Sequence, residues 1–128
     1  MPNFLVEETT VRECGESPVL DFGESQTYDL MLTLELTHVR QHQDLDVHIL
    51  ASYDGVNWLQ RPVASFLEKM HCGTYKIVLP APGVRYLKAV WRVNGWNRTN
   101  TQPLFRFCVA VQPARREPAR ARMMAGAA

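Results

Sequence analysis

Two long segments of the chain alternate apolar and polar residues, and this alternation limits the possible folds more than any other feature. Residues 28–36 place Tyr28 and four evenly spaced leucines on one face, with mostly polar residues on the other. Residues 45–53 repeat the spacing from Leu45 to Tyr53. Side chains of a β-strand point alternately to two faces, whereas an amphipathic helix needs apolar residues three and four positions apart. Both segments are therefore predicted to be half-buried strands.

The same alternation recurs in residues 73–79, 84–93 and 104–111, and turn-forming residues separate these segments. The last segment places four large apolar residues on one face: Phe105, Phe107, Val109 and Val111. In residues 84–93, Tyr86 and Val90 lie on the second face, so we expect that strand to be covered on both sides.

The rest of the chain is less regular. Residues 4–13 predict a strand, residues 17–25 a short strand or a covering loop, and residues 62–70 a strand or one helical turn. Together the segments predict an all-β fold of seven or eight strands joined mostly by short turns. Such a chain folds as an antiparallel β-sandwich, either jelly-roll or immunoglobulin-like. The order of the strands stays open.

The composition changes after Gln112, which divides the 128 residues into a domain, 1–112, and a tail, 113–128. The domain has ten Lys and Arg against twelve Asp and Glu, whereas the tail has four arginines and one glutamate. The tail has no aromatic or β-branched residue, and such a segment cannot bury enough apolar surface to order itself. We therefore expect a mildly acidic sandwich with a basic Pro/Ala/Arg tail.

Three widely spaced cysteines, Cys14, Cys72 and Cys108, do not form the even-numbered framework of a disulfide-rich secreted protein. The N-terminus has no basic segment followed by a long apolar one, so no secretion signal is expected. No apolar run is long enough for a membrane helix. We therefore expect reduced thiols, with Cys108 in the core, in a cytoplasmic protein or one assembled into a particle made in the cytoplasm.

The heptapeptide SYDGVNW, residues 52–58, predicts a tight hairpin turn. Asp54-Gly55 supplies the positive-φ positions of such a turn, and Trp58 follows where a returning strand would bury an aromatic residue. Its pattern, S-x-D-G-x-x-W, resembles a turn of discoidin-like and sialidase-like β-sandwich modules, which occur in extracellular and virion proteins. The resemblance implies that Asp54 caps the turn and that Trp58 packs beneath it.

Residues 73–107 resemble small stand-alone bacterial β-sandwich proteins of uncharacterised function. The resemblance rests on turn and core residue types: Gly73, Tyr75, Tyr86, Leu87, Trp91, Trp96, Pro103, Leu104 and Phe105. It implies a fold and no catalytic residue.

No pattern in the chain specifies catalysis. The sequence has no nucleophile elbow and no glycine-rich phosphate loop. Asp44 and Asp46 share a strand face, but a glycosidase would also need a substrate cleft. His38, His42 and His48 are close in the sequence, and a hairpin would bring His38 near His48. They lack the short ligand motifs of a zinc site, so we expect solvated or hydrogen-bonded histidines and no catalytic residue, cofactor or metal.

The candidate contacts with a partner lie in the loop after residue 95 and in the tail. Trp96 is costly to expose in a polar loop, so it either caps the end of the sandwich or contacts a partner, with Arg98 on the same surface. The tail is a disordered end or an arm that docks on the acidic N-terminal region of a neighbouring subunit. Binding to nucleic acid is less favoured, because four arginines release few counterions. The predicted partner-binding residues are Trp96, Arg98, Arg115, Arg116, Arg120 and Arg122.

These features predict a non-catalytic structural or protein-interaction module. The expected setting is a larger bacterial or phage-type assembly, in which the chain is a small subunit of a homo-oligomer or complex. Long strands with exposed edges pair with other chains unless they are covered. One alternative is a carbohydrate-binding sandwich that stacks sugars on Tyr53, Trp58 and Trp96. Another is an enzyme that uses the histidine cluster with a bound metal.

Overall fold

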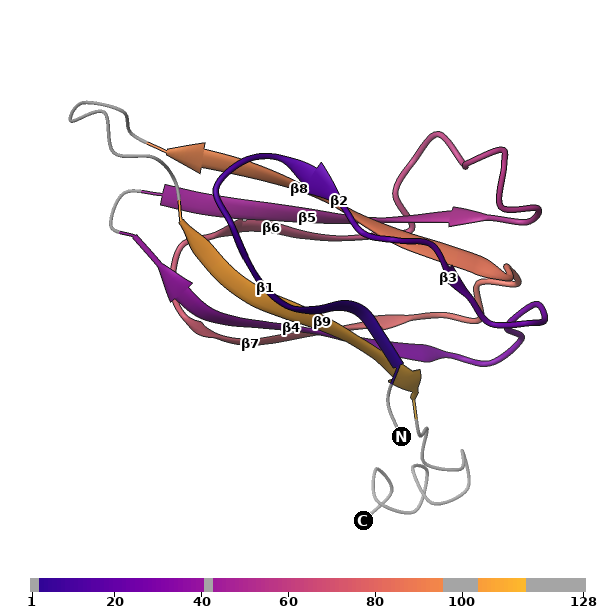
Figure 1. Ribbon diagram of the computed structural model, residues 1–128. Helices are drawn as coiled ribbons and strands as arrows, with labels where there is room; N and C mark the ends of the chain where they lie inside the picture. The colour runs from indigo at the N-terminus through magenta and orange to yellow at the C-terminus, as the bar shows by residue number, and fades with distance from the viewer. Residues whose placement is uncertain (1–2, 41–42, 96–103, 115–128) are drawn as a thin grey trace, which may run out of the picture.

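The computed structural model describes residues 3–40, 43–95 and 104–114. All the regular secondary structure in these ranges is β-strand. Two antiparallel sheets pack face to face (Figure 1). The strands are β1 (Asn3–Val11), β2 (Gly15–Glu16), β3 (Leu20–Asp21), β4 (Leu30–Val39), β5 (Gln43–Ser52), β6 (Ala64–Lys69), β7 (Gly73–Leu79), β8 (Tyr86–Gly95) and β9 (Phe105–Pro113). The predicted antiparallel β-sandwich is confirmed. No helix in the described ranges is long and apolar enough to cross a membrane.

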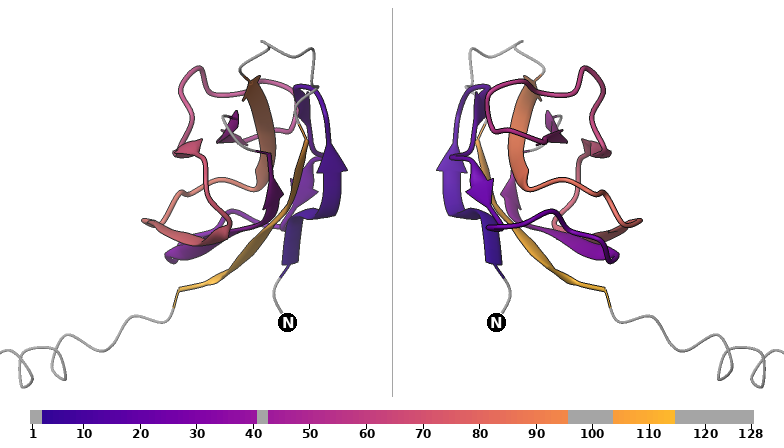
Figure 2. Two further views of the ribbon diagram at one scale, coloured as in Figure 1. Left: turned by 90° about the vertical axis from the view of Figure 1, so that its left-hand side faces the viewer. Right: turned by 90° about the vertical axis from the view of Figure 1, so that its right-hand side faces the viewer.

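The sheets combine strands that are far apart in the sequence. Sheet A has the order β1-β9-β4-β7, and sheet B has the order β2-β8-β5-β6, with β3 also paired to β8. Figure 2 shows the two layers viewed along the strands. The consecutive strands β4 and β5 lie in different sheets, so the chain crosses the sandwich between Val39 and Gln43. Each sheet is therefore built largely by hydrogen bonds between segments that are far apart in the sequence.

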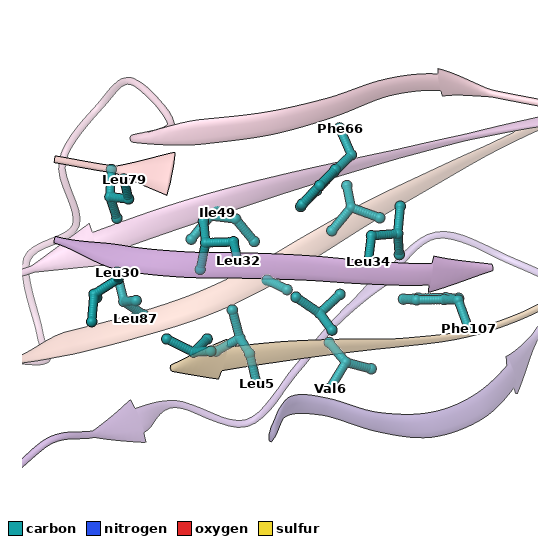
Figure 3. Packing of buried hydrophobic residues seen from close by; sticks show 14 of the residues in the cluster. Leu5, Val6, Leu30, Leu32, Leu34, Ile49, Phe66, Leu79, Leu87 and Phe107 are labelled. Atoms are coloured by element: carbon teal, nitrogen blue, oxygen red, sulfur yellow. The ribbon is translucent and has the colours of Figure 1, made fainter. Parts of the chain in front are cut away.

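The core lies between the sheets and follows the alternation in the sequence. Four leucines of β4 point inward beside the inward residues of β9 in the same sheet, and the inward residues of β5 in sheet B face them (Figure 3). The hydrophobic residues of these three strands that are at most 1% exposed are Leu30, Leu32, Leu34, Leu36, Leu45, Val47, Ile49, Ala51, Phe105, Phe107, Val109 and Val111. Complete burial of a large aliphatic or aromatic side chain contributes about 1.5–3 kcal/mol, so this layer is the main source of stability.

The structure corrects the expected position of three side chains. Tyr28 and Tyr53 were assigned to buried faces, but they are 47% and 64% exposed. They lie outside the strands, because β4 begins at Leu30 and β5 ends at Ser52. Cys108 is not in the core: it lies on the outer face of β9 and is only partly covered.

The structure distinguishes the alternatives for residues 17–25 and 62–70. Residues 62–70 contain the strand β6 and no helical turn, and residues 17–25 contain the two-residue strand β3. The described residues form nine strands, more than the expected seven or eight. The count is higher because it includes β2 and β3, which are each only two residues long. Both short strands pair with β8, where they form the broken edge of sheet B.

Candidate protein-interaction surfaces

The SYDGVNW segment forms a self-contained loop. Ser52 and Trp58 pair across it, and five residues, 53–57, lie between them. One carboxylate oxygen of Asp54 accepts the backbone N–H groups of Val56 and Asn57, each at 2.8 Å. The hydroxyl of Ser52 accepts the N–H of Gly55 at 2.8 Å and donates to the carbonyl of Asn57 at 2.6 Å.

The expected tight turn with positive φ at both Asp54 and Gly55 is wrong, because the loop is wider and only Gly55 of the pair has a positive φ, 80°. Asp54 nevertheless caps the bend. The backbone N–H groups of Asn57 and Val56 donate hydrogen bonds to its carboxylate. These bonds hold the pKa of Asp54 far below its usual range. Because its carboxylate is occupied by the loop itself, the segment acts as a bend and offers little to a ligand.

The aromatic residues near this loop do not form an open platform. The ammonium group of Lys88 lies 4.5 Å from the centre of the Trp58 ring, so one face of that ring is occupied. Trp96 lies outside the described residues. Gly95, which precedes it, pairs with Gln43, whereas Ser52 lies at the opposite end of β5. Gly95 and the Ser52–Trp58 loop therefore lie at opposite ends of sheet B.

The described histidines His38 and His48 lie in different sheets. The two strands that carry them, β4 and β5, therefore do not form the hairpin that would bring His38 near His48. Nδ1 of His48 is 2.8 Å from the hydroxyl of Ser65 on the neighbouring strand β6. His42 lies outside the described residues. Within the described ranges, no three His, Cys, Asp or Glu side chains come together in an arrangement that would hold a metal ion.

The paired carboxylates of β5 have structural partners. The side-chain amide of Asn94 donates to Asp44 at 2.7 Å and to Asp46 at 3.3 Å. Asp46 also accepts the backbone N–H of Glu68 at 2.7 Å. The two carboxylates therefore connect β5 to β8 and β6, and this geometry gives them a role in holding sheet B together.

The acidic N-terminal region, proposed as the docking surface of the tail, is partly neutralised within the chain. Three of its carboxylates form ion pairs with cations of later strands and loops: Glu8 with Arg106 at 3.1 Å, Glu16 with Lys88 at 3.6 Å, and Asp21 with Arg85 at 2.7 Å. All the predicted partner-binding residues, Trp96, Arg98, Arg115, Arg116, Arg120 and Arg122, lie outside the described residues.

A shallow depression of about 450 Å³ lies on the outer face of sheet A. Irregular pairing of β1 with β9 leaves the consecutive residues Glu7 and Glu8 both exposed, and they line it with Glu35 and Cys108. Burial raises the pKa of the Cys108 thiol, and the carboxylates of Glu35 and Glu8 raise it further. A thiol that stays protonated is a poor nucleophile, so this environment disfavours Cys108 as a nucleophile.

The edges of the two sheets differ in a way that sequence reasoning missed. Strand β1 has two register shifts against β9, β6 has one shift beside the positive-φ residue Glu68, and β2 and β3 are separated by a segment that contains Pro18. In contrast, β7 pairs with β4 without a shift from Gly73 to Leu79. Within the described part of the chain, nothing pairs with the other side of β7.

A regular edge strand presents a row of unpaired N–H and C=O groups, and bulges or breaks interrupt such a row. Strand β7 is therefore the one uninterrupted edge among the described strands. The exposed edge was expected from the length of the strands. Its identity could not be predicted, because it depends on the strand order.

Comparison with models of known protein families gives no match, and comparison with curated proteins gives none either.

Proposed function

We propose that this chain is a non-catalytic protein-interaction module, a small subunit of a larger bacterial or phage-type assembly. The observation that supports the proposal most strongly is the regular edge of β7, which is seven residues long. Proteins that stay monomeric usually interrupt or cover such an edge. Among the described strands, the other sheet edges are interrupted and the edge of β7 is continuous.

The side chains of β7 support the same proposal. The outward-facing Val78 is 46% exposed, and Lys76 is the only charged residue on the strand. Charged residues on an edge strand discourage pairing with another chain, and β7 has few of them. Loop and tail residues complete the contact surface in this proposal: Trp96, Arg98, Arg115, Arg116, Arg120 and Arg122.

The proposal is tested by the native size of the tagged chain in an extract of its source cells. We expect the wild-type chain to elute in a complex much larger than one chain. A variant with Trp96→Ala, Arg115→Ala and Arg116→Ala is expected to shift toward the size of a monomer. Arg92→Ala is the control, because Arg92 is an exposed arginine on the outer face of sheet B. Elution of the wild-type chain as a monomer would contradict the proposed function.

A further inference from the structure

We infer that β7 pairs antiparallel with β7 of a second copy of this chain, about a two-fold axis at Ile77. The pairing would join two four-stranded A sheets into one continuous sheet. This inference rests on the proposed function and names the partner of the β7 edge. A two-fold contact uses the same patch on both subunits, so the strand must be complementary to itself.

The inward face of β7 meets this requirement. Tyr75, Ile77 and Leu79 point toward the interior of the sandwich. The first two are only half-buried, because no described strand lies beyond β7 in sheet A. A pairing centred on Ile77 places Tyr75 opposite Leu79 of the second copy and Ile77 opposite its own counterpart. Every inward pair is then apolar, and the half-buried side chains gain cover from the second core.

The outward face is compatible with the same register. Side chains alternate strictly along a strand, so only registers that keep outward residues opposite outward residues are compatible with the sandwich. A pairing centred on Lys76 would place that lysine opposite its own copy, and like charges directly opposite are destabilising. A pairing centred on Ile77 places Lys76 opposite Val78, whose exposed surface the aliphatic part of the lysine can cover.

A pairing centred on Tyr75 is less favourable. It would place Gly73 opposite Ile77 of the second copy and leave the exposed Val78 without a partner inside the strand. The ring of Tyr75 also has local partners: Lys69 Nζ lies 4.4 Å from its centre, and its hydroxyl donates to the carbonyl of His71 at 2.5 Å. Ile77 has no polar group to satisfy and is better suited to the symmetry axis.

The test is the absolute mass of the purified full chain, measured by light scattering over a range of concentrations. We expect a dimer for the wild type. Val78→Lys would oppose two lysines at two places in each dimer and should raise the dissociation constant about tenfold or more. The double variant Lys76→Glu/Val78→Lys would place opposite charges at the same positions and should restore the dimer. Circular dichroism spectra check that each variant is folded.

The matched control is Phe4→Lys. Phe4 is 49% exposed on the outer face of sheet A, but on the bulged edge strand β1 at the opposite side. We expect this variant to remain a dimer. A wild-type chain that is monomeric at every concentration would overturn the inference, as would a dimer that Val78→Lys leaves intact. Failure of the double variant to restore the dimer would overturn the register.

These outcomes separate the inference from the proposed function. A purified chain that is monomeric, together with a large complex in the cell extract, would overturn pairing with a second copy and would support binding to a different protein. A monomer in both measurements would overturn both.

Discussion

The carboxylate of Asp46 accepts the backbone N–H of Glu68 at 2.7 Å, at the point where β6 departs from regular pairing. Glu68 is the only non-glycine residue in the described ranges with a positive φ, 51°. This conformation is strained for a residue with a side chain, and the hydrogen bond that the N–H of Glu68 donates to Asp46 helps to hold it. The two residues together interrupt the edge of sheet B on the side where β7 leaves sheet A open.

We predict that Asp46→Ala lowers the free energy of unfolding by about 1 kcal/mol, because the N–H of Glu68 loses its protein acceptor. Asp44→Ala is the matched control, since Asp44 accepts only a side-chain amide in the hydrogen bonds seen on this face. Urea unfolding of both variants measures the difference. Equal effects of the two substitutions would show that the bulge does not depend on Asp46.

The lowered pKa of Asp54 predicts that the stability of the fold depends on pH. Its pKa is lowered by the N–H groups of Asn57 and Val56, so its folded-state pKa lies below the ordinary value of 3.8. Its stabilising effect is therefore fully present above about pH 4 and is lost as the pH falls through the folded-state pKa.

Asp54→Ala should lower the melting temperature at pH 7, and the gap to the wild type should narrow as the pH falls below about 4. Thermal melts at a series of pH values measure this. Glu24→Ala, in the loop before β4, is the control and should keep the wild-type profile. A gap that stays constant down to pH 2 would exclude the ionised carboxylate as the cause.

Much of the sandwich could be predicted from the sequence, because alternation reports directly which face of a strand is buried. The four leucines of β4 and the inward residues of β9 are buried as expected. Alternation does not show where a strand ends, so Tyr28 and Tyr53 were placed inside strands that stop short of them.

Sheet membership could not be predicted, because pairing joins segments that are far apart in the chain. The separation of His38 from His48 depends on the crossing between β4 and β5, and no local residue type specifies that crossing. The bulges of β1 and the regularity of β7 also depend on partners that the sequence does not identify. The resemblance of residues 73–107 to small bacterial proteins stays a prediction.

Cys108 should react more slowly with iodoacetamide at pH 8 than Cys14 and Cys72. Both of these are exposed, whereas Cys108 is partly buried and its raised pKa lowers the thiolate fraction. Mass spectrometry of digested samples over time gives the three rates. Glu35→Gln should speed the reaction of Cys108 and leave the other two rates unchanged. Unchanged labelling of Cys108 in this variant would contradict a role for the Glu35 charge.

From the contacts at the end of β9, we predict that two C-terminal truncations differ in their free energy of unfolding. Pro113 pairs with Leu30, and the N–H of Ala114 donates to the carbonyl of Asp29 at 2.9 Å. A chain stopped after Ala114 should keep the wild-type stability, whereas a chain stopped after Gln112 should lose about 1 kcal/mol. Urea unfolding compares the two. The same loss from both truncations would show that the basic tail itself stabilises the domain.

The most direct test of the central claim is amide hydrogen exchange of the chain in its native complex, compared with the free chain diluted until it is a monomer. Strand pairing protects backbone amides that were exposed at a sheet edge. If the chain works through its open edge, exchange in β7 slows in the complex while exchange in the bulged edge strand β1 does not change. Equal exchange of β7 in the free and assembled chains would contradict the claim that this edge binds a protein partner.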